Sequence, residues 1–229
     1  MTDLHIHTFE STKRFITQFN DNWIIVVIMI ALLLLSLLIT RSSDRLKHIP
    51  EALVNDIGIN KLLFNGSLFN NGLGYFMLVF YAIPTSLFYY ELLTIQNSYT
   101  YGLQGFYLYI VLFGIALLIP AIKWVIISFM LYLINFKEVR QQIITINLSY
   151  NYAVGVFLLF ATIICTYSPY KNLTYITLAL MVILYIFSFL RIFFIGFNHK
   201  QLSNIYYFIY LCMLKILPAV AIAVAIFGQ

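Results

Sequence analysis

The sequence predicts an all-α membrane protein: a polytopic bundle of about six transmembrane helices in a single domain. Hydrophobic residues make up 62% of the 229-residue chain and charged residues only 9%, whereas water-soluble domains are about a quarter charged. The mean hydropathy is +0.93. A soluble core cannot enclose this much apolar surface, so the excess must face lipid. In hydrocarbon every backbone polar group needs an internal partner, so the spans must be helical.

Six apolar segments are long enough to cross a hydrocarbon core of about 30 Å, which takes roughly 20 helical residues. They cover residues 22–40, 73–94, 104–135, 143–167, 174–197 and 204–228. The third is longer than one straight crossing requires, so it is expected to tilt, to kink at Pro120 or to extend beyond the membrane. Residues 1–21 form a polar N-terminal segment, and residues 22–229 form one transmembrane domain.

The longest loop, residues 41–72, is expected to contain a short helix lying on the membrane surface. Pro50 and Glu51 favour a helix start there. Apolar residues follow at near-helical spacing, namely Leu53, Val54, Ile57 and Leu62. The alternative is an ordinary loop that packs on the bundle.

Loop cations predict the orientation. Residues 41–72 carry four lysines or arginines, residues 136–142 carry two and residues 198–203 carry Lys200, whereas the loops on the opposite side hold only Lys171. The positive-inside rule therefore places the basic loops in the cytoplasm and both termini, including residues 1–21, outside. Lys13 and Arg14 are the exceptions to this pattern.

Lys215 lies near the middle of the last span, three residues before Pro218. A charge at the bilayer centre costs about 3 kcal/mol or more, so it needs a reason. Pro218 leaves the carbonyl of Leu214 without its usual helical donor, and a lysine can donate to such a group. The functional interpretation is a site for an ion, a proton or a lipid phosphate. The structural interpretation, a lysine that fixes helix packing, is favoured.

A second polar group is predicted between the third and fourth spans. A short turn joins these spans, so Lys123 and Asn151 are expected at similar depths. Asn147, Asn151 and Gly155 are four residues apart and share one helix face. This face is expected to meet the third span, with Asn151 or Asn147 accepting a hydrogen bond from Lys123. Such a pair contributes about 0.6–2 kcal/mol.

Two further charged residues lie toward the ends of spans. Glu91 stands beside Tyr89 and Tyr90, which are typical of the interfacial aromatic belt, so we expect Glu91 to be hydrated. Arg191 is expected to reach the cytoplasmic headgroups.

Three prolines well inside spans are candidate helix breaks: Pro84, Pro120 and Pro218. Broken helices with polar groups at the midplane occur in transporters, although membrane helices tolerate proline generally. No Ser–His–Asp or paired-carboxylate set can be assembled at one depth. The sequence therefore predicts no metal site and no cofactor, and it favours a protein that is not an enzyme.

The segment "YLCMLKILP", residues 210–218, resembles the closing motif of an uncharacterised family of multi-pass inner-membrane proteins from Bacteroidota, catalogued as a domain of unknown function. The likeness extends loosely over most of the chain, with a basic flank after the first span and "INFKEVRQQ" between the third and fourth. The resemblance implies a bundle in the bacterial inner membrane and supplies no activity.

These observations favour a protein that acts by binding, as a non-catalytic inner-membrane subunit or scaffold of a larger assembly. The expected partners are the bilayer, other integral membrane proteins and anionic lipid headgroups. The net charge of +5 is small, so nucleic acid is not expected. The alternative is a small transporter or lipid-handling protein that uses Lys123 and Lys215 around Pro120 and Pro218.

Overall fold

A computed structural model describes most of the first five predicted spans and part of the first loop. It covers residues 22–55, 58–59, 61–62, 72–95, 105–133, 137–168, 170 and 172–198. Its principal elements are helices: α2 (Asn22–Leu46), α3 (Ile49–Val54), α5 (Leu73–Ile95), α6 (Phe106–Leu133), α7 (Lys137–Tyr167) and α8 (Asn172–Asn198). The predicted all-α class is therefore confirmed for the described residues.

Five of these helices are long and apolar enough to cross a membrane, namely α2, α5, α6, α7 and α8. They coincide with the first five predicted spans. The sixth predicted span, with Lys215 and Pro218, lies outside the described residues, as does the N-terminal segment 1–21. The chain divides into two compact units after Leu180, and the described part of the second unit continues α8 to Asn198.

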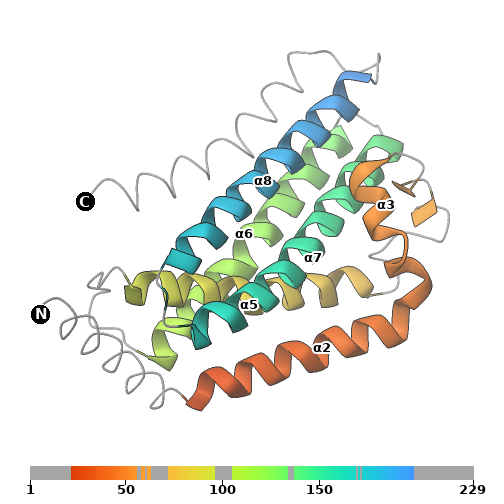
Figure 1. The fold of residues 1–229 in the computed structure, drawn as a ribbon. Coiled ribbons are helices and arrows are strands. Elements are labelled where there is room, and N and C mark those ends of the chain that lie inside the picture. Colours follow the sequence, from red (N-terminus) through yellow and green to blue (C-terminus); the bar gives the residue numbers. More distant parts are fainter. Residues whose placement is uncertain are drawn as a thin grey trace, which may run out of the picture. The chain divides into compact units, whose positions relative to one another are not determined.

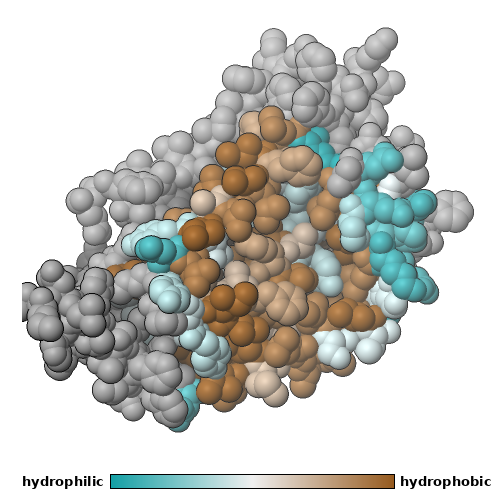
Figure 2. Space-filling view, in the orientation of Figure 1, coloured by the Kyte–Doolittle hydropathy of each residue, from teal (hydrophilic) through white to brown (hydrophobic). Residues whose placement is uncertain are grey.

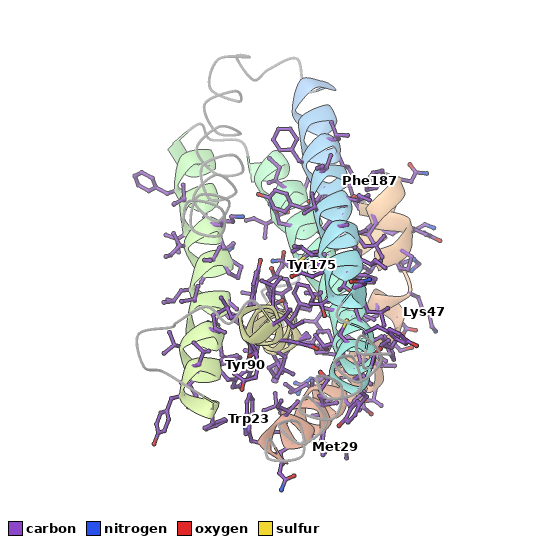
Figure 3. All side chains as sticks on the ribbon, turned by 60° about the vertical axis from the view of Figure 1, so that its left-hand side comes forward. Trp23, Met29, Lys47, Tyr90, Tyr175 and Phe187 are labelled. Carbon is purple, nitrogen blue, oxygen red and sulfur yellow. The ribbon has the colours of Figure 1, made fainter. Side chains whose placement is uncertain are left out.

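Helix α5 is the centre of the first unit and packs against α2, α6 and α7. Figure 3 looks nearly along the α5 axis and shows these helices around it. Of the five spans, α5 has the largest buried share, and Met77, Phe80 and Phe88 on it are completely enclosed. A membrane helix that is covered by protein on most sides does not need to present a lipid-facing side, which explains why Thr85 and Ser86 are buried on it as well.

Gly155 of α7 packs closely against α5. A Cβ atom at Gly155 would lie 3.2 Å from Cε1 of Phe80 and 3.2 Å from Cα of Tyr81. Small residues allow membrane helices to approach this closely. The prediction that the face carrying Gly155 meets the third span is therefore wrong at this position. Helices α6 and α7 do contact one another, but Gly155 packs against α5.

An aromatic cluster joins the start of α2, the end of α5 and the start of α6; we call this the Trp23 end of the bundle. The ring centroid of Trp23 lies 5.1 Å from that of Tyr90, 5.6 Å from that of Phe106 and 5.2 Å from that of Tyr109. Figure 3 shows Trp23 and Tyr90 directed toward one another. Aromatic pairs at such separations contribute about 0.5–1.5 kcal/mol each beyond their buried area.

Two of the three prolines expected to break helices lie in the described residues, and neither ends its helix. Pro84 lies inside α5 and Pro120 inside α6, and both helices continue past them. Pro84 is fully buried, and packing against neighbouring helices holds such a residue in a helical path despite the missing hydrogen bond. The non-helical backbone instead occurs in α2, at Ser42 (φ −140°, ψ 29°), which the sequence did not predict.

The surface of the spans is largely apolar. Large side chains such as Met29, Tyr107 and Val125 are more than half exposed, as expected for helices whose solvent is hydrocarbon. Figure 2 shows this apolar surface in brown, with hydrophilic side chains gathered where α2 ends and α3 lies (Figures 1 and 2). We call this second end, formed by the end of α2, the start of α5, the start of α7 and α3, the α3 end.

Candidate binding platform at the α3 end

Helix α3 begins where the sequence predicted. Pro50 is in its first turn and Glu51 supplies an acidic side chain there, which suits the positive end of the helix dipole. The helix is shorter than expected, because Asn55 adopts an extended conformation (φ −130°, ψ 146°) and its N–H donates to the carbonyl of Glu51. Ile57 lies outside the described residues.

An apolar anchor fixes this region to the bundle. We define the platform as residues 48–55, 58–59 and 61–62. Four of its apolar side chains are at most 2% exposed: Ile49, Ala52, Ile59 and Leu62. At about 25 cal/mol per Å² of buried apolar area, each large side chain of such an anchor contributes roughly 1.5–3 kcal/mol. The platform is thus packed like a core, although it lies outside the spans.

One hydrogen bond ties the platform to a membrane helix. The hydroxyl of Tyr150 on α7 donates to the carbonyl of Leu53, 3.2 Å away. Helices α3 and α7 also pack against each other. Because α7 is itself in contact with α5 through Gly155, the platform is connected to the centre of the bundle.

The chain returns to α3 at Gly58, where only glycine fits. A Cβ atom there would lie 2.4 Å from the backbone N of Ala52 and 2.5 Å from the carbonyl carbon of Glu51. Both are backbone atoms, which cannot rotate away as a side chain can. Gly58 is a structural residue of the platform that the sequence reasoning did not single out, although a glycine between apolar residues was a possible signal.

Charged groups occupy the exposed side of the platform. Lys61 donates from Nζ to Oε2 of Glu51 over 3.0 Å, and Nδ1 of His48 lies 3.5 Å from the same oxygen. The hydrogen bond and the positive charge of Lys61 hold the pKa of Glu51 below its ordinary value of 4.5. About half of each side chain in the Glu51–Lys61 pair is exposed, so the pair contributes little to stability but displays charges of both signs at fixed positions.

Glu91, at the Trp23 end, is half-buried rather than fully open to water. Its Oε2 accepts a hydrogen bond from Oγ1 of Thr166 on α7, over 3.3 Å. One residue away, Sγ of Cys165 lies 3.5 Å from Oγ1 of Thr177 on α8. These contacts link helix ends through polar side chains, and they resemble packing interactions of membrane helices more than a reactive site.

The hydrogen bond predicted between Lys123 and Asn151 or Asn147 stays a prediction. Nδ2 of Asn147 is enclosed and has no hydrogen-bond partner among the described residues. Lys123 is half-buried, and α6 continues for ten residues beyond it to Leu133.

Arg191 lies on α8, seven residues before the helix ends at Asn198, and its reach to the cytoplasmic headgroups stays a prediction. In the ranges that the structure describes, no three His, Cys, Asp or Glu side chains lie close enough to hold a metal ion.

The fold and these sites define the chain as a multi-pass membrane protein with five described spans. Over residues 24–226 it matches the family described as Domain of unknown function (DUF4271), and it belongs to that family. No curated protein matches the chain, and no solved structure matches it.

Proposed function

We propose that this protein is a non-catalytic integral subunit or scaffold of the bacterial inner membrane, which binds another membrane protein through the platform at the α3 end. The observation that supports this proposal is the platform itself. Crossing the bilayer requires only the spans, yet the chain also orders a short helix beside them and encloses Ile49, Ala52, Ile59 and Leu62.

Ordering a loop costs conformational entropy, and a binding surface is one reason for a protein to keep a loop ordered. Fixing the backbone of each residue costs about 1–2 kcal/mol of conformational entropy, which burial of the apolar anchor must offset. Anchored on α7 through Tyr150, the platform presents Glu51 and Lys61 in a defined geometry. Fixed charges of both signs favour specific recognition and orientation of a partner.

The orientation follows from loop charge. Arg41, Lys47 and Lys61 are all at the α3 end, so the positive-inside rule favours a cytoplasmic position for the platform. The partner surface would then be reached from the cytoplasm or from a neighbouring protein in the same membrane.

Purification in mild detergent from the native host tests the proposal. We expect a stoichiometric partner that co-elutes with the wild type and is lost with Glu51→Lys. The double variant Glu51→Lys with Lys61→Glu is the matched control, because it restores an ion pair of opposite direction. It should recover the thermal stability of the wild type without recovering the partner.

Three results would contradict the proposal. The wild-type protein could elute as a solitary monomer, or the partner could stay bound to both platform variants. Recovery of the partner by the double variant would also count against it, since the charges would then serve only to hold the platform together.

A further inference from the structure

A groove lies between α2 and α5 at the α3 end, with a volume of about 690 Å³. One wall is apolar and consists of Leu34, Leu37 and Leu38 of α2 with Leu73 and Phe76 of α5. The α2 residues of this wall belong to a span of high hydropathy, so the wall lies at the depth of the hydrocarbon. Leu37 and Phe76 are each about half exposed, which leaves apolar surface open to an occupant.

The rim of the groove is polar. It is formed by Thr40, Arg41, Ser42 and Ser43, and the helical path of α2 is interrupted there, at Ser42. Seven residues separate Leu34 from Arg41, which is about 10 Å along a helix. The groove therefore changes from apolar to polar over the distance that separates the upper acyl chain of a lipid from its headgroup.

Arg41 supplies the positive charge of the rim. Its guanidinium forms no ion pair with a carboxylate in the described part of the chain. Asp44 also lines the groove, but its side chain is 97% exposed and its Oδ1 lies 3.5 Å from Nζ of Lys47. The arginine is thus available to an anion, and guanidinium groups bind phosphate oxygens through paired, charge-assisted hydrogen bonds.

We propose that this groove binds one anionic glycerophospholipid of the surrounding bilayer, with its phosphate at Arg41 and an acyl chain along the leucine wall. The complementary charge at the rim and the apolar wall below it match the two halves of such a molecule. A soluble phosphate ester would fill the rim only, and a protein helix would leave the arginine without an anion. None of the lining residues belongs to the platform, so the lipid site stands independently of the proposed partner.

Native mass spectrometry of the delipidated full-length protein tests the site, with phosphatidylglycerol as the probe. We expect one tightly bound lipid, about tenfold weaker binding with Arg41→Gln, and loss of that lipid with Leu37→Trp, which fills the groove. Because Leu37 is 53% exposed, the larger ring should not disturb folding, and an unchanged thermal midpoint would verify this. Lys47→Gln is the matched control, since Lys47 is close in sequence but does not line the groove.

Several outcomes would overturn the lipid site. Arg41→Gln or Leu37→Trp could bind phosphatidylglycerol as tightly as the wild type. Lys47→Gln could weaken binding as much as Arg41→Gln, which would indicate a diffuse basic surface. Diacylglycerol could bind as well as the phospholipid, or glycerol phosphate could displace it at equal concentration. Finally, the groove could be occupied by another protein that excludes the lipid.

Discussion

Replacing Gly155 by valine tests the packing of α7 on α5 directly. The Cβ atom alone would lie 3.2 Å from the ring of Phe80 and 3.2 Å from Cα of Tyr81, so the two methyl groups of valine must push the helices apart. Phe80 is fully enclosed and has little room to turn. Overpacking of this kind costs about 1–3 kcal/mol.

The matched control is Gly114→Val in α6. No atom lies within 4 Å of the position that a Cβ atom would take at Gly114, so valine should fit there without a steric cost. Both substitutions exchange glycine for valine within a helix, which favours helix formation by about 0.5 kcal/mol in each case. The difference between the two variants therefore isolates the steric cost at the α5–α7 contact.

The assay is reversible unfolding in mixed micelles, followed by circular dichroism. We expect the free energy of unfolding of Gly155→Val to be about 1–3 kcal/mol below that of Gly114→Val. Equal free energies for the two variants would refute the close approach of α7 to α5. A larger loss for Gly114→Val would place the tight contact on α6 instead.

Three further predictions concern the two ends of the bundle. Trp23→Ala removes the centre of the aromatic cluster and should lower the free energy of unfolding by about 3 kcal/mol; a loss below about 1 kcal/mol would argue against the cluster. Tyr150→Phe deletes the donor to Leu53 and should cost about 1 kcal/mol, with faster hydrogen exchange confined to the platform; uniform exchange would contradict this. Lys61 lowers the pKa of Glu51 in the folded protein from its ordinary value of 4.5. The small contribution of the pair to stability is therefore present above pH 4.5 and is lost as the pH falls through the lowered pKa. Glu51→Gln should remove this part of the pH dependence of the thermal midpoint, and an unchanged dependence would show that the pair contributes nothing.

Hydropathy was sufficient to find the spans, because each must be long and apolar whatever its neighbours are. The five described spans agree with the predicted segments to within a few residues, apart from α2, which ends six residues later than predicted, and α7, which begins six residues earlier. The residues Pro50 and Glu51 also correctly predicted the start of α3. These are properties of short stretches of sequence, which one chain can reveal without knowledge of its tertiary contacts.

Helix partners could not be predicted in the same way. The short turn before α7 indicated α6 as its neighbour, which is correct, but it did not reveal that Gly155 faces α5. Proline was expected to break α5 and α6, yet packing around Pro84 keeps the helix continuous. The groove and the return of the chain at Gly58 depend on contacts between segments distant in sequence. Local sequence therefore could not reveal these contacts, although the glycine at position 58 was itself a possible signal.

Accessibility of single cysteines to a charged, membrane-impermeant maleimide tests the membrane account most directly, in a background where Cys165 and Cys212 are replaced by serine. We predict that Lys47→Cys reacts only from the cytoplasmic side, that Tyr107→Cys reacts only from the outside, and that Val125→Cys, although 58% exposed, reacts from neither side because lipid covers it. Reaction of Val125→Cys in intact membranes, or of Lys47→Cys and Tyr107→Cys from the same side, would contradict the account.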